Sequence, residues 1–121
     1  MLRFGFALVV AAMAACGSPG VAAAASTYDG RWSVIIETEQ GNCDQAYRYG
    51  LNIVNGNVTY SGNGAFDVRG RVTRNGAVHV RVSRGATYAD GHGRLSQSSG
   101  SGHWHGMGSG VCSGRWVAER R

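Results

Sequence analysis

Residues 112–121, with the sequence CSGRWVAERR, are the stretch that decides the fold. The stretch holds one of the two cysteines outside the N-terminal apolar region, repeats the Gly-Arg-Trp of residues 30–32 and ends in two arginines. We interpret it as the closing strand of a small barrel, held by a disulfide and lying beside the strand that begins near residue 30. The chain between these two ends must then supply the other strands.

The chain between residues 31 and 119 alternates apolar and polar residues, and no window shows the spacing of a helix. The alternation predicts strands over residues 31–38, 46–54, 58–60, 66–72, 77–83, 87–95, 103–105 and 112–119. Asn-Gly pairs at residues 55–56 and 75–76 are typical of tight hairpins, because both residue types tolerate positive φ. We interpret residues 97–102 as a turn and residues 106–110 as a glycine-rich loop. Residues 87–95 should be bent or closely approached at Gly91 and Gly93.

Eight short strands joined by tight turns predict one all-β domain over residues 26–121. The expected architecture is an antiparallel eight-stranded up-and-down barrel. Closure of the barrel removes the exposed strand edges that such alternation would otherwise leave unprotected. An open sheet or a two-layer β-sandwich is the structural alternative.

Residues 1–25 have the features of a signal peptide. Arg3 precedes an apolar run over residues 4–15, and small residues occupy positions 22–25. The apolar run is too short to span a bilayer as a helix. We expect export and removal of residues 1–25, with a secreted or periplasmic mature protein. The alternative is a lipoprotein anchored through Cys16, although Met13 stands where lipoboxes usually have Leu, Val or Ile.

Export places Cys43 and Cys112 in an oxidising compartment, where we expect them to form a disulfide. In the chain-entropy model a loop of this length stabilises the fold by about 4 kcal/mol. The formal net charge of +5 comes from arginine without any lysine. In an exported protein this charge is compatible with binding to an envelope surface, a glycan or an acidic partner. Nucleic acid is a less favoured partner than these outside the cytoplasm.

Aromatic residues form the first candidate site. At one end of a barrel they could line a pocket for a hydrophobic or sugar-like ligand, or they could fill the core. The residues expected to bind a ligand are Trp32, Tyr47, Tyr49, Trp104 and Trp116.

Arginines and histidines form two further candidate sites. Arg69, Arg71 and Arg81 are predicted on outward faces of adjacent strands, as a basic patch for carboxylates, sulfates or phosphates or as a solvated face. His103 and His105 share one face of a strand and could bind a metal ion, with His92 or His79 as a third ligand. The alternative is that both are solvent-facing histidines beside a buried tryptophan.

The sequence Gly30-Arg31-Trp32, together with Arg120 and Arg121, resembles the calycin arrangement of lipocalins and avidins. In that arrangement a Gly-x-Trp near the start packs under an arginine from the final strand, so the resemblance implies a closed barrel with this contact. Residues 28–32, 99–102 and 112–116 are also similar to a group of small exported bacterial β-barrel proteins of unassigned activity. That similarity supports export and the disulfide, and it implies no catalytic residue.

The sequence contains no nucleophile elbow, zinc-protease motif or phosphate-binding loop, so we expect no catalysis and no cofactor. The favoured function is a monomeric binding module for an unidentified small ligand or envelope component, without a membrane span and without nucleic acid as a partner. The alternative is an interaction role, as an inhibitor or a structural accessory of the envelope. Metal or haem capture is a third hypothesis. An open cavity lined by Trp and Tyr would favour the first hypothesis, and a filled core with a contiguous exposed patch the second.

Overall fold

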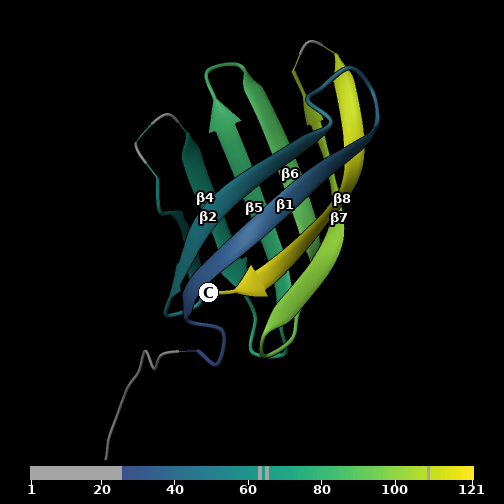
Figure 1. The fold of residues 1–121 in the computed structure, drawn as a ribbon. Coiled ribbons are helices and arrows are strands. Elements are labelled where there is room, and N and C mark those ends of the chain that lie inside the picture. The colour runs from purple at the N-terminus through teal and green to yellow at the C-terminus, as the bar shows by residue number, and fades with distance from the viewer. Residues whose placement is uncertain (1–25, 63, 65, 109) are drawn as a thin grey trace, which may run out of the picture.

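The computed structural model describes residues 26–62, 64, 66–108 and 110–121, which form one closed barrel of antiparallel strands (Figure 1). The strands are β1 (Gly30–Gln40), β2 (Ala46–Val54), β3 (Asn57–Tyr60), β4 (Asp67–Val72), β5 (Ala77–Arg84), β6 (Thr87–Leu95), β7 (Ser99–Met107) and β8 (Val111–Arg120). This part of the chain has no helix that is long and apolar enough to cross a membrane. The expected signal peptide and Cys16 lie outside the described residues.

The first and last strands pair with each other and close the barrel. β1 and β8 run antiparallel, with Ile36 opposite Trp116 and Trp32 opposite Arg120. The predicted eight-stranded up-and-down barrel is therefore confirmed, and the open sheet and the sandwich are excluded. Trp116 lies opposite Ile36 in this register, so it is not the direct cross-strand neighbour of Trp32.

An arginine closes the end of the barrel where β8 finishes. Nη1 of Arg120 donates to the carbonyl oxygen of Asp29 at 2.7 Å, and Nη2 donates to that of Thr27 at 2.8 Å. Its Nε donates to the carbonyl oxygen of Gln97 at 2.8 Å. The guanidinium carbon lies 4.8 Å from the ring centroid of Trp32, which is only 2% exposed. The contact implied by the calycin resemblance is thus present.

Inward-facing glycines on β6 and β7 make room for one large indole. A Cβ atom added at Gly93 or Gly102 would lie 2.7 Å from the ring of Trp116. The predicted close approach in β6 is therefore confirmed at Gly93, whereas a Cβ at Gly91 would meet that ring at an ordinary 3.5 Å. Because neither glycine has a side chain, the indole of Trp116 packs directly against the backbone of β6 and β7.

Several predicted strand boundaries are wrong. β1 runs to Gln40, two residues beyond its predicted end at Thr38. Residues 99–102 belong to β7 and are not part of a turn, because Gly100 and Gly102 pair with Ala118 and Trp116 of β8. Residues 106–107 also belong to β7 and not to a loop. Phe66 precedes β4, which begins at Asp67, and its ring packs with the aromatic residues described below.

The two Asn-Gly pairs form different turns. Asn55 and Gly56 both have positive φ, 53° and 80°, as a two-residue type I′ hairpin requires. The carboxylate of Asp29 accepts from both of their backbone N–H groups, at 2.7 and 3.2 Å. At the other pair only Gly76 has positive φ, and the strands are joined by the longer connection of residues 73–76.

Candidate functional site

One end of the barrel is open and forms a mouth. The connections β1–β2, β3–β4, β5–β6 and β7–β8 lie at this end, away from the end that Arg120 closes (Figure 1). A cavity of about 330 Å³ occupies the mouth. Its wall includes Tyr47, Tyr49, Phe66 and Trp104, with polar groups from Thr38, Asp44 and Arg84.

Four aromatic rings form a cluster at one side of this mouth. Tyr47 and Tyr49 are stacked, with centroids 4.9 Å apart and planes 7° from parallel. The ring of Phe66 meets Tyr49 edge-on at 5.5 Å and Tyr60 at 5.6 Å. Burial, followed by the charges of Tyr47, Tyr60 and Asp44, raises the pKa of Tyr49 to about 12. We call Tyr47, Tyr49, Tyr60 and Phe66 the mouth cluster.

A smaller cavity of about 70 Å³ lies in the barrel interior, and its wall is apolar. Trp32, Trp104 and Trp116 line it together with aliphatic side chains of β1, β2 and β5. Tyr49 and Trp104 line both cavities, so the interior space lies directly beneath the mouth. The five predicted ligand-binding aromatics are therefore divided, since Tyr47 lines only the mouth and Trp32 and Trp116 only the interior.

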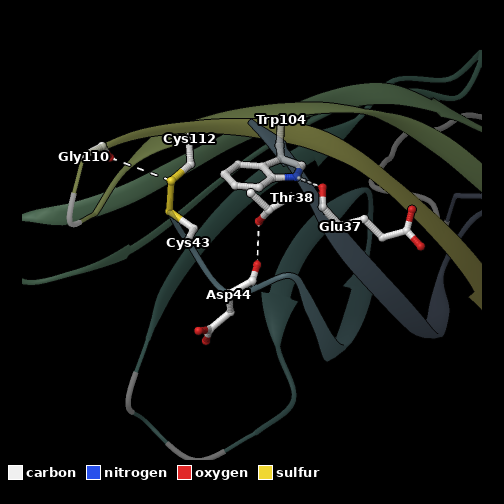
Figure 2. The surroundings of a disulfide bond; sticks show 7 residues. All are labelled: Glu37, Thr38, Cys43, Asp44, Trp104, Gly110 and Cys112. Atoms are coloured by element: carbon white, nitrogen blue, oxygen red, sulfur yellow. Dashed lines mark hydrogen bonds between the residues drawn. A yellow bond between two sulfur atoms is a disulfide. The ribbon is translucent and has the colours of Figure 1, made fainter. Parts of the chain in front are cut away.

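The predicted disulfide is present between Cys43 and Cys112, with a sequence separation of 69 residues. It joins the β1–β2 connection to the first residues of β8 at the mouth (Figure 2). Nearby, Nε1 of Trp104 donates to the carbonyl oxygen of Glu37 at 3.0 Å, and Oγ1 of Thr38 donates to that of Asp44 at 2.6 Å. These bonds hold the wall of the mouth in one arrangement, as binding without large rearrangement requires.

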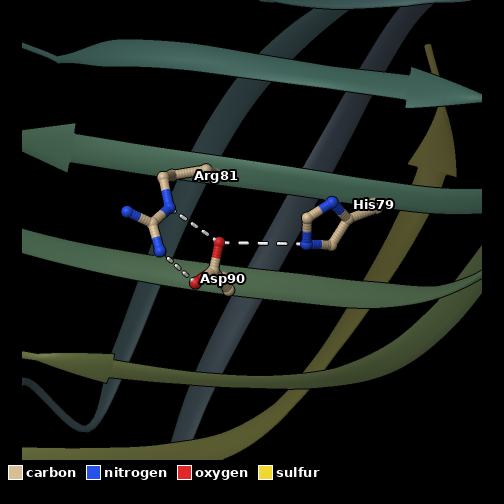
Figure 3. A network of polar contacts seen from close by, with 3 residues as sticks. All are labelled: His79, Arg81 and Asp90. Atoms are coloured by element: carbon tan, nitrogen blue, oxygen red, sulfur yellow. Dashed lines mark hydrogen bonds and ion pairs between the residues drawn. The ribbon is translucent and has the colours of Figure 1, made fainter.

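The predicted basic patch lies on the outer surface. Arg69 is directly opposite Arg81, and Arg71 is opposite His79. Nε and Nη2 of Arg81 donate to the carboxylate of Asp90 at 2.9 and 2.7 Å (Figure 3). The hydrogen bonds from Arg81 outweigh burial and lower the pKa of Asp90, whose side chain is 12% exposed. Nε of Arg69 donates to Asp67 and Nη1 of Arg71 to Oδ1 of Asn57, both at 3.1 Å, so each arginine of the patch already has a partner within the molecule.

All four histidines point outward from three adjacent strands. His79 and His92 are cross-strand partners on β5 and β6, as are His92 and His103 on β6 and β7. The ring of His92 lies 6.5 Å from those of His79 and His105. Among the described residues no three His, Cys, Asp or Glu side chains are placed to hold one metal ion. A metal role for His103 and His105 stays a prediction.

The sequence pattern does not indicate Phe66 as a member of the mouth cluster, and it does not indicate one ion pair. The alternation predicts Phe66 as part of the strand over residues 66–72. No sequence motif marks Asp90, although the tight turn after Arg84 sets a register that places it opposite Arg81. Counting residues outward from that turn along both strands places Arg81 opposite Asp90. No protein-family model, curated protein or solved structure matches the chain.

Proposed function

We infer that the protein is an exported, non-catalytic binding module whose barrel takes a small ligand with a flat apolar part through the mouth. The observation that carries this proposal is the 330 Å³ cavity whose wall includes Tyr47, Tyr49 and Phe66 of the mouth cluster. Ligand pockets are concave, mostly apolar and commonly about 300 to 1,000 Å³ in volume. The mouth cavity therefore suits a ligand of one or two rings.

The distribution of groups around the mouth indicates the orientation of the ligand. The stacked rings of Tyr47 and Tyr49 offer a flat face, against which an aromatic or sugar ring can lie. The guanidinium carbon of Arg84 lies 5.7 Å from the ring centroid of Phe66, at the rim. A negatively charged or strongly polar end of the ligand would meet this guanidinium, with the ring end directed inward.

The interior cavity limits what can enter beneath the mouth. An apolar cavity of about 150 Å³ is large enough for benzene. The 70 Å³ interior space is smaller and accommodates a short alkyl group. A disulfide is typical of oxidising compartments, which supports a secreted or periplasmic location for this binding role.

Titration with 1-anilinonaphthalene-8-sulfonate, which combines flat rings with an anionic group, tests the proposal. Ala89 lines both cavities, so Ala89→Phe should fill the passage between them and weaken binding at least tenfold. Val117→Phe adds the same ring on the outward face of β8 and should leave the affinity unchanged. Far-ultraviolet circular dichroism checks that both variants keep the strands.

Tyr47→Ala provides a second variant that does not depend on how the interior tolerates a larger side chain. Tyr47 is 44% exposed, so its removal should cost little stability while it removes one face of the stacked pair. We expect weaker binding of the same probe. If Ala89→Phe and Tyr47→Ala both bind it as tightly as the unsubstituted protein, the mouth is not the binding site.

A further inference from the structure

The outward faces of five adjacent strands carry a continuous row of basic and titratable side chains. From β4 to β8 the direct cross-strand partners are Arg71, His79, His92, His103 and Arg115. All five side chains are exposed. Neighbouring strands lie about 4.8 Å apart, so the row is about 19 Å long. We call these five residues the histidine row.

The charges next to the histidine row largely cancel one another. The neighbouring charged or titratable groups on β4 to β8 and on adjoining β1 are Asp67, Arg69, Arg81, Asp90, Arg94, His105, Glu37 and Glu39. The carboxylate of Asp90 accepts from Arg81 in a bidentate contact and also lies 3.8 Å from Nε2 of His79 (Figure 3). Nε of Arg115 lies 3.9 Å from a carboxylate oxygen of Glu39. The net charge of this surface therefore depends mainly on how many imidazoles are protonated.

Protonation would turn the row into a line of like charges. Imidazoles gain a proton between about pH 5 and pH 7, whereas arginine is charged throughout this range. Like charges directly opposite each other on adjacent strands repel, so the protonated row costs free energy when it stands alone. A chain of anionic groups would offset that cost through charge-assisted hydrogen bonds.

We propose that the histidine row binds a flexible acidic polysaccharide, a linear chain carrying sulfate or carboxylate groups, and that acidification strengthens this binding. The row crosses five of the eight strands of a closed barrel, so it winds around a convex surface. With the usual strand tilt it covers about a third of a turn. A flat bilayer would touch only the middle of such a row, whereas a flexible chain can follow all of it.

The same surface is less suited to single-stranded nucleic acid. Binding of single strands combines positive charge with aromatic side chains on which bases stack. Among the described outward-facing residues of β4 to β8, Tyr88 is the aromatic one besides the imidazoles. The guanidinium carbon of Arg81 lies 4.3 Å from its ring centroid and covers it. The row therefore offers charge and hydrogen-bond donors without an open stacking surface.

Binding of short dextran sulfate, measured by calorimetry at pH 5.5 and pH 7.5 over a series of salt concentrations, tests the proposal. We expect at least tenfold tighter binding at pH 5.5 and a steeper slope of log affinity against log salt, because protonated imidazoles add charges to the contact. A variant with His79→Gln, His92→Gln and His103→Gln should lose both the pH dependence and the extra slope.

A control variant removes the same number of positive charges from other surfaces. Arg31→Gln, Arg74→Gln and Arg121→Gln should keep the pH dependence, because none of these residues belongs to the row. Polyuridylate and phosphatidylglycerol vesicles serve as competing probes in the same buffers. The proposal is overturned if the histidine variant keeps the pH dependence, if the control variant loses it equally, or if either competing probe binds as tightly as dextran sulfate at pH 5.5.

Discussion

Replacing Arg120 with alanine should destabilise the barrel far more than replacing the arginine beside it. The substitution removes one partly buried and two exposed hydrogen bonds to backbone carbonyl oxygens, and it uncovers the ring of Trp32. One partly buried charged bond, two weaker exposed ones and the ring contact together contribute about 3 to 4 kcal/mol. For a domain of this size each kcal/mol lowers Tm by about 4 to 8 °C, so a loss of about 12 to 32 °C is expected.

Urea and thermal unfolding followed by tryptophan fluorescence measure the effect. Arg121→Ala is the matched control, because Arg121 is bonded to the barrel through its backbone N–H, which donates to the carbonyl oxygen of Arg31 at 2.8 Å and stays in the variant. That variant should stay within about 0.5 kcal/mol of the unsubstituted protein. Arg120→Lys keeps the charge without the planar fork and should fall between the two. Equal stabilities of Arg120→Ala and Arg121→Ala would refute the role assigned to this guanidinium.

Other predictions concern the mouth, the interior glycines and high pH. Replacing Cys43 and Cys112 together by alanine should lower the free energy of unfolding by about 4 kcal/mol, because the disulfide, with its separation of 69 residues, no longer restricts the unfolded chain. Urea titration of oxidised and reduced protein gives the comparison. Gly102→Ala should cost about 1 to 3 kcal/mol, because its Cβ would overlap neighbouring atoms, whereas Gly91→Ala has its nearest contact at 3.5 Å and should be nearly neutral in the same assay. Ultraviolet titration should show one tyrosine that ionises near pH 12, and Tyr49→Phe should remove it. Since the folded pKa of Tyr49 lies above the ordinary 10.0, its contribution to stability is complete below pH 10 and is lost as the pH rises toward 12, which unfolding at several alkaline pH values can verify.

Alternation and turn residues were enough to predict eight antiparallel strands, because each inward position is decided by its own strand. Closure was favoured over an open sheet because it removes exposed strand edges. The bounds of β2 and β6 were predicted as residues 46–54 and 87–95, and both agree with the structure. The start of β7 could not be predicted in the same way. Its glycines face inward and leave room for Trp116 on the next strand, which cannot be seen from residues 99–102 by themselves. The composition of that segment alone suggests a turn.

The candidate site depended on register and on side-chain packing, which periodicity does not describe. Alternation predicted that Tyr47 and Tyr49 share a face, but it could not predict that Phe66 packs with them from outside the strands. The histidine row illustrates the same limit. Each of its members was predicted on a strand, yet their alignment across β4 to β8 follows from the lengths of four successive turns.

The pairing of β1 with β8 also sets the order in which the protein can fold. Residues 30–40 find one of their two partners only in residues 111–120, so the barrel has a high contact order and should fold slowly for its size. Until β8 is present, β1 and β7 each have an unpaired edge that can associate with other chains. A chain that emerges with its N-terminus first therefore stays open until its last strand has arrived, and the period of greatest aggregation risk ends at that step.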